Sequence, residues 1–218
     1  MRRYLQRLGS RTEFAVVIGI CLGWSIVESV RDFALGRPLP RFAEGDVLLL
    51  AAFELVAGLL AGAFLALRGW SWSAFNVRFS WRTTGGGLLL VGASYASFIA
   101  GAMVVAMTPG GEAALRALPD FPGVWIPVAA LASVVNGCFE ELVLVGYVFR
   151  VLEQQGLGIA MGTSVLLRLL MHLYQGPLGA TGILLLGMLF GIIYWDYRQL
   201  WPLILAHILL DFVGLARF

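Results

Sequence analysis

The sequence predicts an all-α membrane protein, a polytopic bundle of about seven transmembrane helices (six to eight). Of its 218 residues, 60% are apolar and only 13% are charged. An ordinary globular domain carries about 25% charged residues. The mean hydropathy of +0.86 and a series of long apolar runs point to the same class. We expect one membrane domain over residues 1–218.

Seven apolar runs account for the expected helices. They are 14–30, 47–67, 88–107, 124–149, 159–173, 182–195 and 200–215. The last three are short, which suits helices that tilt little or begin in the interfacial region. The first run follows four arginines, as in a signal peptide, but no convincing small-residue cleavage site comes after it. We therefore expect it to be the first membrane helix.

Arginine placement orients the predicted helices, because all fifteen basic residues are arginines. The N-terminal tail holds Arg2, Arg3, Arg7 and Arg11, and the segment 68–84 carries arginine with no acidic residue. The alternate loops balance arginine with acidic residues such as Asp120. The positive-inside rule therefore predicts a cytoplasmic N-terminus. The aromatic and basic stretch 69–82 is typical of an interfacial segment.

The composition also bears on partners. The net charge is only +2, and no basic patch is interleaved with exposed aromatic residues. We therefore expect membrane lipids as partners and no nucleic acid.

Two adjacent carboxylates interrupt the middle of the run 124–149. A charge at membrane depth is costly unless it faces the bundle interior and finds a partner or water, so Glu140 and Glu141 need a specific reason. On a helix, Asn136 and Glu140 share a face, while Glu141 points about 100° aside.

The only two histidines of the chain, His172 and His207, lie in later apolar runs. Arg168 precedes His172 by one helical turn, and Asp211 follows His207 by one turn, so each pair shares a helix face. With a rise of about 1.5 Å per residue, these side chains and Glu140 reach comparable depths. We expect them to meet in one site inside the bilayer.

Such a set has more than one possible chemistry. A carboxylate and an imidazole that share a water can make it a nucleophile, and a second histidine beside a carboxyl can donate to an oxyanion. Together they would hydrolyse a peptide bond inside the membrane. Alternatively, Glu140, His172 and His207 form a three-ligand set of the kind found in catalytic zinc sites. Haem ligation by the two histidines would leave the carboxylates unexplained.

The order of these residues resembles the CPBP (Abi) family of intramembrane endopeptidases, the CAAX proteases and bacteriocin-processing enzymes. The family pattern is EExxxR, then FxxxH, then HxxxN or HxxxD. It matches here at Glu140 and Glu141, at His172, and at His207 with Asp211. The resemblance covers about 124–213, which it implies is the catalytic core.

The resemblance implies a role for each matched residue. Glu140 would be the water-activating base, assisted by His172. His207 and Asp211 would hold the oxyanion or orient the scissile amide, and Glu141 would be a supporting carboxylate. The resemblance also implies a protein of the bacterial cytoplasmic (inner) membrane and a membrane-anchored or lipidated peptide substrate. It leaves open whether a divalent metal such as zinc, or no cofactor, takes part.

Two departures from the pattern stand out. Val145 occupies the position of the family arginine, and Arg168 replaces the aromatic residue before the first histidine. We predict that Arg168 supplies the missing charge from another helix and pairs with Glu141, because each would otherwise be a stranded charge. The departures also keep two alternatives open. One is a catalytically silent relative that binds or chaperones partners, and the other is a transporter or immunity protein with the same polar pocket.

Overall fold

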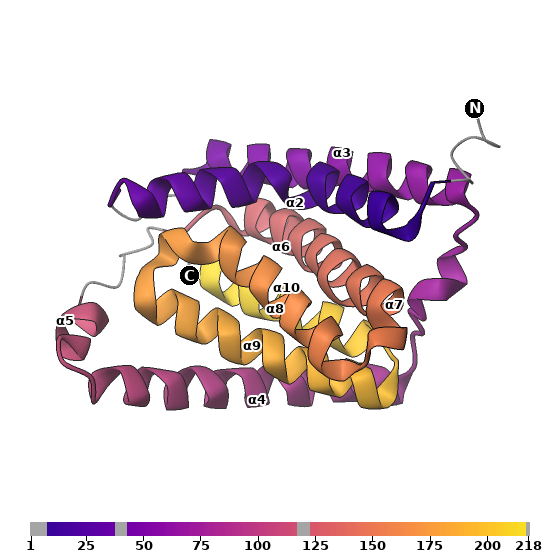
Figure 1. Cartoon of the computed structure of the whole chain (residues 1–218). Helices are drawn as coiled ribbons and strands as arrows, with labels where there is room; N and C mark the ends of the chain where they lie inside the picture. The colour runs from indigo at the N-terminus through magenta and orange to yellow at the C-terminus, as the bar shows by residue number, and fades with distance from the viewer. Residues whose placement is uncertain (1–7, 38–42, 117–122, 217–218) are drawn as a thin grey trace.

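Figure 1 shows the computed structural model, which describes residues 8–37, 43–116 and 123–216. The helices are α2 Ser10–Ala34, α3 Glu44–Arg68, α4 Trp81–Ala106, α5 Gly111–Arg116, α6 Ile126–Glu140, α7 Val148–Leu152, α8 Leu157–His172, α9 Gly176–Tyr197 and α10 Trp201–Leu215. A π-helical turn, Glu141–Tyr147, joins α6 to α7. Within the described residues, the only β-type pairing is one isolated bridge between Val124 and Ala216.

The prediction of an all-α membrane bundle of about seven helices is confirmed. Five described helical stretches are long and apolar enough to cross a membrane, namely α2, α3, α4, Ile126–Gln155 and Leu157–Tyr197. The last of these folds back on itself at the short turn Leu173–Gln175, so that α8 and α9 form an antiparallel hairpin (Figure 1). With α10, a shorter apolar helix of 15 residues, the bundle has the expected apolar segments.

One face of α10 is buried within the bundle. In Figure 1, α2 and α3 lie along one face of the bundle and α4 lies along the opposite face. Between them, α10 contacts both α4 and α6. Gly137 of α6 permits the second contact, since a Cβ there would lie 2.8 Å from Cγ1 and 3.0 Å from the backbone N of Ile208. This glycine therefore brings α6 and α10 close together at the depth where the predicted site residues lie.

Some helices begin earlier than the apolar runs indicated. α4 begins at Trp81 rather than at residue 88, because the side chain of Ser80 caps it by accepting a hydrogen bond from the Thr83 backbone N at 3.1 Å. α9 begins at Gly176 with Pro177 in its first turn, a position that proline favours. The predicted interfacial stretch 69–82 contains only a short 3₁₀ helix, Trp72–Phe75, before α4 begins.

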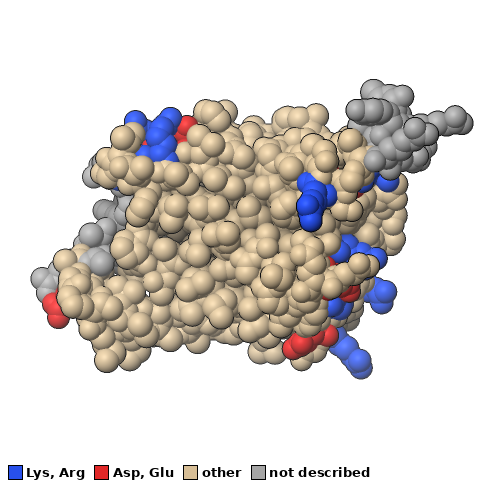
Figure 2. Space-filling view, in the orientation of Figure 1, with Lys and Arg blue, Asp and Glu red and all other residues tan. Residues whose placement is uncertain are grey.

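Charged residues lie mostly at the two ends of the bundle (Figure 2). The end where α2 begins and α3 finishes carries Arg11, Arg68, Arg78, Arg82, Arg150 and Arg198. At the opposite end, Arg31 pairs with Glu28, and Arg37 pairs with Asp32 at 2.8 Å. Four residues used in the orientation argument, Arg2, Arg3, Arg7 and Asp120, lie outside the described residues.

Candidate active site

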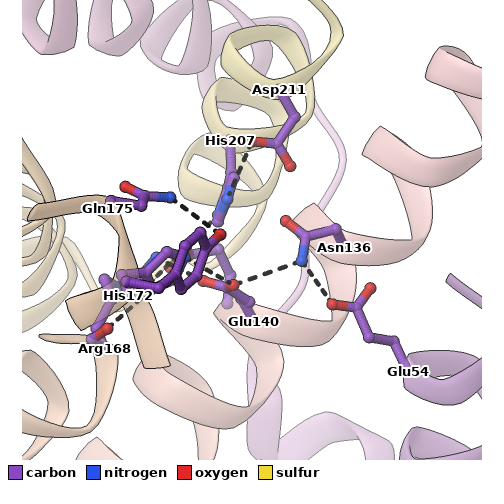
Figure 3. Close-up of polar contacts among 10 residues, drawn as sticks. Glu54, Asn136, Glu140, Arg168, His172, Gln175, His207 and Asp211 are labelled. Carbon is purple, nitrogen blue, oxygen red and sulfur yellow. Dashed lines mark hydrogen bonds and ion pairs between the residues drawn. The ribbon is translucent and has the colours of Figure 1, made fainter. Parts of the chain in front are cut away.

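Three helices bring the predicted polar residues together in the bundle interior (Figure 3). α6 and the π-helical turn contribute Glu140 and Glu141, α8 contributes Arg168 and His172, and α10 contributes His207 and Asp211. These segments are far apart in the sequence. They meet because α6 packs against α10, and because α8 contacts the π-helical turn.

Arg168 links the two adjacent carboxylates. Its Nη1 lies 3.0 Å from Oε2 of Glu140, and its Nη2 lies 2.7 Å from Oε1 of Glu141. The arginine side chain is 1% exposed, so these are buried, charge-assisted contacts. The pairing of Arg168 with Glu141 agrees with our sequence-based prediction, and the contact with Glu140 is an addition to it. Val145, at the position of the family arginine, is instead packed in an apolar cluster with Phe149 and Leu200.

His207 lies between two carboxyl groups. Its Nδ1 is 2.7 Å from Oε1 of Glu141, and its Nε2 is 3.5 Å from Oδ1 of Asp211. The same oxygen of Glu141 thus faces both His207 and Arg168. Glu141 holds α8 and α10 together from the π-helical turn.

His172 faces Glu140 without contacting it directly. Its Nδ1 lies 2.8 Å from the backbone oxygen of Arg168, which favours a proton on Nδ1 and a lone pair on Nε2. Nε2 lies 3.8 Å from Oε1 of Glu140, beyond direct hydrogen-bond distance. A water molecule can bond to both groups across such a gap.

A fourth helix, α3, joins the site through Glu54, which the sequence analysis did not assign to the site. Asn136 Nδ2 donates to Oε1 of Glu54, on α3, at 2.7 Å, and to Oε1 of Glu140 at 3.4 Å. Glu54 is only 4% exposed. Its depth in an apolar run was the only signal in the sequence, because its partner is 82 residues away.

The backbone changes at the carboxylates. The segment Glu141–Tyr147 is π-helical, and single π-helical turns within α-helices are frequent at functional sites. Its wider turn alters the helical phase between Glu140 and α7. Phe75 and Leu200 pack tightly against Gly146 in this turn, at 3.0 Å and 3.1 Å from where its Cβ would stand.

The site borders a cavity of about 530 Å³. Its deep wall includes Glu140, Asn136 and Glu54. Its lining continues past His172 and Asp211 to residues at the end of the bundle opposite the first residues of α2, among them Glu28, Asp32, Tyr174, Gln175 and Leu215. The cavity therefore runs from the centre of the bundle toward the end that carries the turn between α8 and α9 (Figure 1).

The sequence suggested Glu140, His172 and His207 as a set of metal ligands. Glu140 and His172 face each other, but both ring nitrogens of His207 face carboxyl groups, Glu141 on one side and Asp211 on the other. In the part of the chain that the structure describes, no group of three or more His, Cys, Asp or Glu is arranged to hold a metal ion. The three side chains therefore do not fit a metal centre.

Comparison with known proteins finds a family match for residues 122–213. Residues 122–213 match the family model described as type II CAAX prenyl endopeptidase Rce1-like, which belongs to the CPBP family. Neither a curated protein nor a solved structure matches the chain. The match contains Asn136, Arg168 and all five residues of the predicted motifs, whereas α2, α3 and α4 lie outside it. Over residues 122–213, this match confirms the resemblance to the CPBP family that the motifs predicted.

Proposed function

We propose that this protein is an intramembrane endopeptidase that cleaves a membrane-anchored peptide or protein, with residues 124–213 as its catalytic core. The observation that carries the proposal is the Glu140–His172 pair. Both groups face the cavity, they lie 3.8 Å apart, and Arg168 fixes the carboxylate from behind. The match of residues 122–213 to the model of a protease family supports the same conclusion.

Glu140 is the base in this proposal. Its carboxylate takes a proton from a water molecule that also bonds to Nε2 of His172, and the resulting hydroxide attacks the scissile carbonyl carbon. Arg168 keeps this carboxylate ionised and fixed, because a guanidinium within hydrogen-bond distance favours the charged form. The proton held by Glu140 then passes to the leaving amine as the C–N bond breaks.

The imidazole N–H of His207 stabilises the oxyanion that develops on the carbonyl oxygen, and the carboxylate of Asp211 orients the scissile amide by accepting from its N–H. Asp211 lines the cavity, and His207 lies behind it at 3.5 Å. Glu141 orients His207 through the 2.7 Å contact to Nδ1. Donors that are held in place before the reaction stabilise developing charge without a reorganisation cost. Glu141 is therefore a positioning residue, whereas Glu140, His172, His207 and Asp211 face the reaction.

We also propose that the N-terminus lies in the cytoplasm, because the arginines gather at the end of the bundle where α2 begins (Figure 2). Labelling with a membrane-impermeant thiol reagent in intact cells tests this orientation. A cysteine at Thr108, after α4, should react, and one at Ser71, between α3 and α4, should react only after permeabilisation. The reverse result would invert the proposed orientation.

The test of function compares wild-type protein with Glu140→Gln in detergent, on a pool of membrane-anchored peptides, with and without a chelator. Glutamine keeps the size and polarity but cannot act as the base, so we expect cleavage to fall by about 10²–10⁴-fold. Asp196→Asn removes one carboxylate from an exposed position at the far end of α9 and serves as the matched control.

Three results would contradict this proposal. Cleavage by Glu140→Gln at the wild-type rate would refute the assignment of the base. Cleavage that chelation abolishes would refute a water activated by Glu140 and His172 alone. Substrate-dependent flux in liposomes without any cleavage would favour a transporter.

A further inference from the structure

Five of the residues that line the cavity beside the site carry carboxyl groups. Its wall includes Glu28, Asp32, Glu54, Glu140 and Asp211, and no arginine side chain lines it in the described part of the chain. Most of these carboxyls have a cationic or imidazole partner. Glu28 and Asp32 pair with Arg31 and Arg37, Glu140 pairs with Arg168, and Asp211 faces His207.

Glu54 differs from the other carboxyl groups of this cavity. Its Oε1 accepts one hydrogen bond from Asn136 at 2.7 Å, but its Oε2 is fully buried and has no hydrogen-bond partner among the described residues. No basic side chain is paired with it in the same described region. Figure 3 shows Glu54 on the far side of Asn136 from Glu140, so that a single amide group separates it from the proposed base.

A buried carboxylate without a cation is unfavourable, because the low-polarity interior neither solvates nor neutralises it. A ligand that brings a positive charge to the carboxyl group of Glu54, which lines the cavity, would relieve this cost. A ligand that brings a carboxylate would add repulsion to a wall that is already acidic, and such repulsion against the wrong ligand is a common source of specificity. The carboxyl group of Glu54 would therefore favour a cationic ligand over an anionic one.

We propose that Glu54 forms a subsite for a basic side chain of the substrate, located close to the scissile bond. The substrate class is a membrane-associated peptide with an arginine or lysine near the cleaved position, rather than one that presents a free terminal carboxylate to this cavity. This inference rests on the proposed function, since it takes the cavity as the place where the substrate binds.

The test measures binding rather than cleavage, on protein that carries Glu140→Gln so that bound peptide stays intact. The probes are an acetylated and amidated apolar hexapeptide that contains one arginine, its citrulline analogue, and the citrulline peptide with a free C-terminal carboxylate. Citrulline has nearly the shape of arginine without its charge. We expect the arginine peptide to bind at least tenfold more tightly than the citrulline peptide, and the free carboxylate to weaken binding further.

Glu54→Gln, added to the protein that carries Glu140→Gln, removes the negative charge of residue 54. The amide oxygen of the new glutamine can still accept a hydrogen bond from Asn136. We expect the ratio between the arginine and citrulline peptides to collapse to about one in this variant. Asp196→Asn, the control with one carboxylate removed elsewhere, should keep the full ratio. Equal binding of both peptides to the parent protein, no binding of the arginine peptide, or an unchanged ratio in Glu54→Gln would each overturn the subsite.

The same peptides, given to protein with Glu140 intact, test the Glu54 subsite and the endopeptidase function independently. Selective binding of the arginine peptide without cleavage would support the subsite and count against the endopeptidase. Cleavage with no preference for the basic residue would support the endopeptidase and overturn the subsite.

Discussion

Two ion-pair clusters that are buried among the described residues differ in how many of their polar atoms have hydrogen-bond partners. Near one end, Glu13 of α2 accepts from Arg68 Nε at 2.6 Å and from Trp70 Nε1 at 3.2 Å, so both carboxylate oxygens are bonded. At the centre, one guanidinium serves both Glu140 and Glu141.

The central cluster contains a carboxylate oxygen without a partner in the described part of the chain, whereas both carboxylate oxygens of Glu13 are bonded. Oε2 of Glu141 and Nε of Arg168 have no hydrogen-bond partner among the described residues, and the same holds for Oε2 of Glu54 nearby. A closed cluster ties helices together, whereas buried groups with spare capacity require an explanation such as a ligand or a reaction. Burial of charge alone therefore does not mark a site, whereas an excess of buried carboxylates over cations does.

We expect the largest effect from Arg168→Gln, which changes the central cluster. The substitution leaves two buried carboxylates without their guanidinium, so we expect the free energy of unfolding to fall by about 3–5 kcal/mol and cleavage to be lost. Denaturant unfolding in detergent and peptide cleavage on the same sample measure both effects. Arg68→Gln is the matched control, expected to lose stability while the folded fraction cuts normally. Wild-type folding and cleavage by Arg168→Gln would refute the central role of this residue.

Gly137→Ala tests position without changing any charge. The added methyl group would meet Ile208, so α10 must move away from α6, and His207 moves with it. We expect a loss of about 1–3 kcal/mol in stability and a fall in cleavage of about 10–100-fold, since small displacements of catalytic groups are costly. Gly62→Ala in α3, where no other atom lies within 4 Å of the added Cβ, should leave both quantities near wild type. Equal behaviour of the two variants would show that the α6–α10 spacing is unimportant.

Glu13→Gln should have the smallest effect. Glutamine still offers an oxygen to Arg68 and Trp70 but removes the charge, so we expect about 1–2 kcal/mol less stability. Cleavage per folded molecule should stay at the wild-type value, measured after correction for the folded fraction. A loss of cleavage in protein that is fully folded would show that the two clusters are coupled.

Much of this architecture follows from hydropathy, because the lipid environment forces each apolar run into a helix. The run 47–67 becomes Glu44–Arg68, with an error of only a few residues. The errors grow where a helix begins with residues of another kind. The first turns of α4 contain Gly85, Gly86 and Gly87, which lower both the apolar character and the expected helix propensity, so its beginning could not be found from composition.

Some contacts of the candidate site follow from spacing within one helix, and others depend on how distant helices pack together. Helical spacing within one run places Asn136 beside Glu140, and His207 beside Asp211, because both pairs are one turn apart. The contact between Glu54 and Asn136 depends on how α3 packs against α6. No local pattern contains that packing. The pairing of Arg168 with Glu141 could be predicted only because charge balance requires a partner for each.

The π-helical turn after Glu140 has a consequence for how this protein tolerates insertions and deletions. A π-helical turn is equivalent to one extra residue within an α-helix. Deleting any single residue of Glu141–Tyr147 would allow a regular α-helix, and so the deletion would not need to break the membrane span. Because six α-helical residues turn through about the same angle as seven π-helical residues, the segments before and after the turn would keep their relative phase. A one-residue deletion in this turn is therefore compatible with both the span and the orientation of Glu140, and it changes the direction of side chains only within the turn itself.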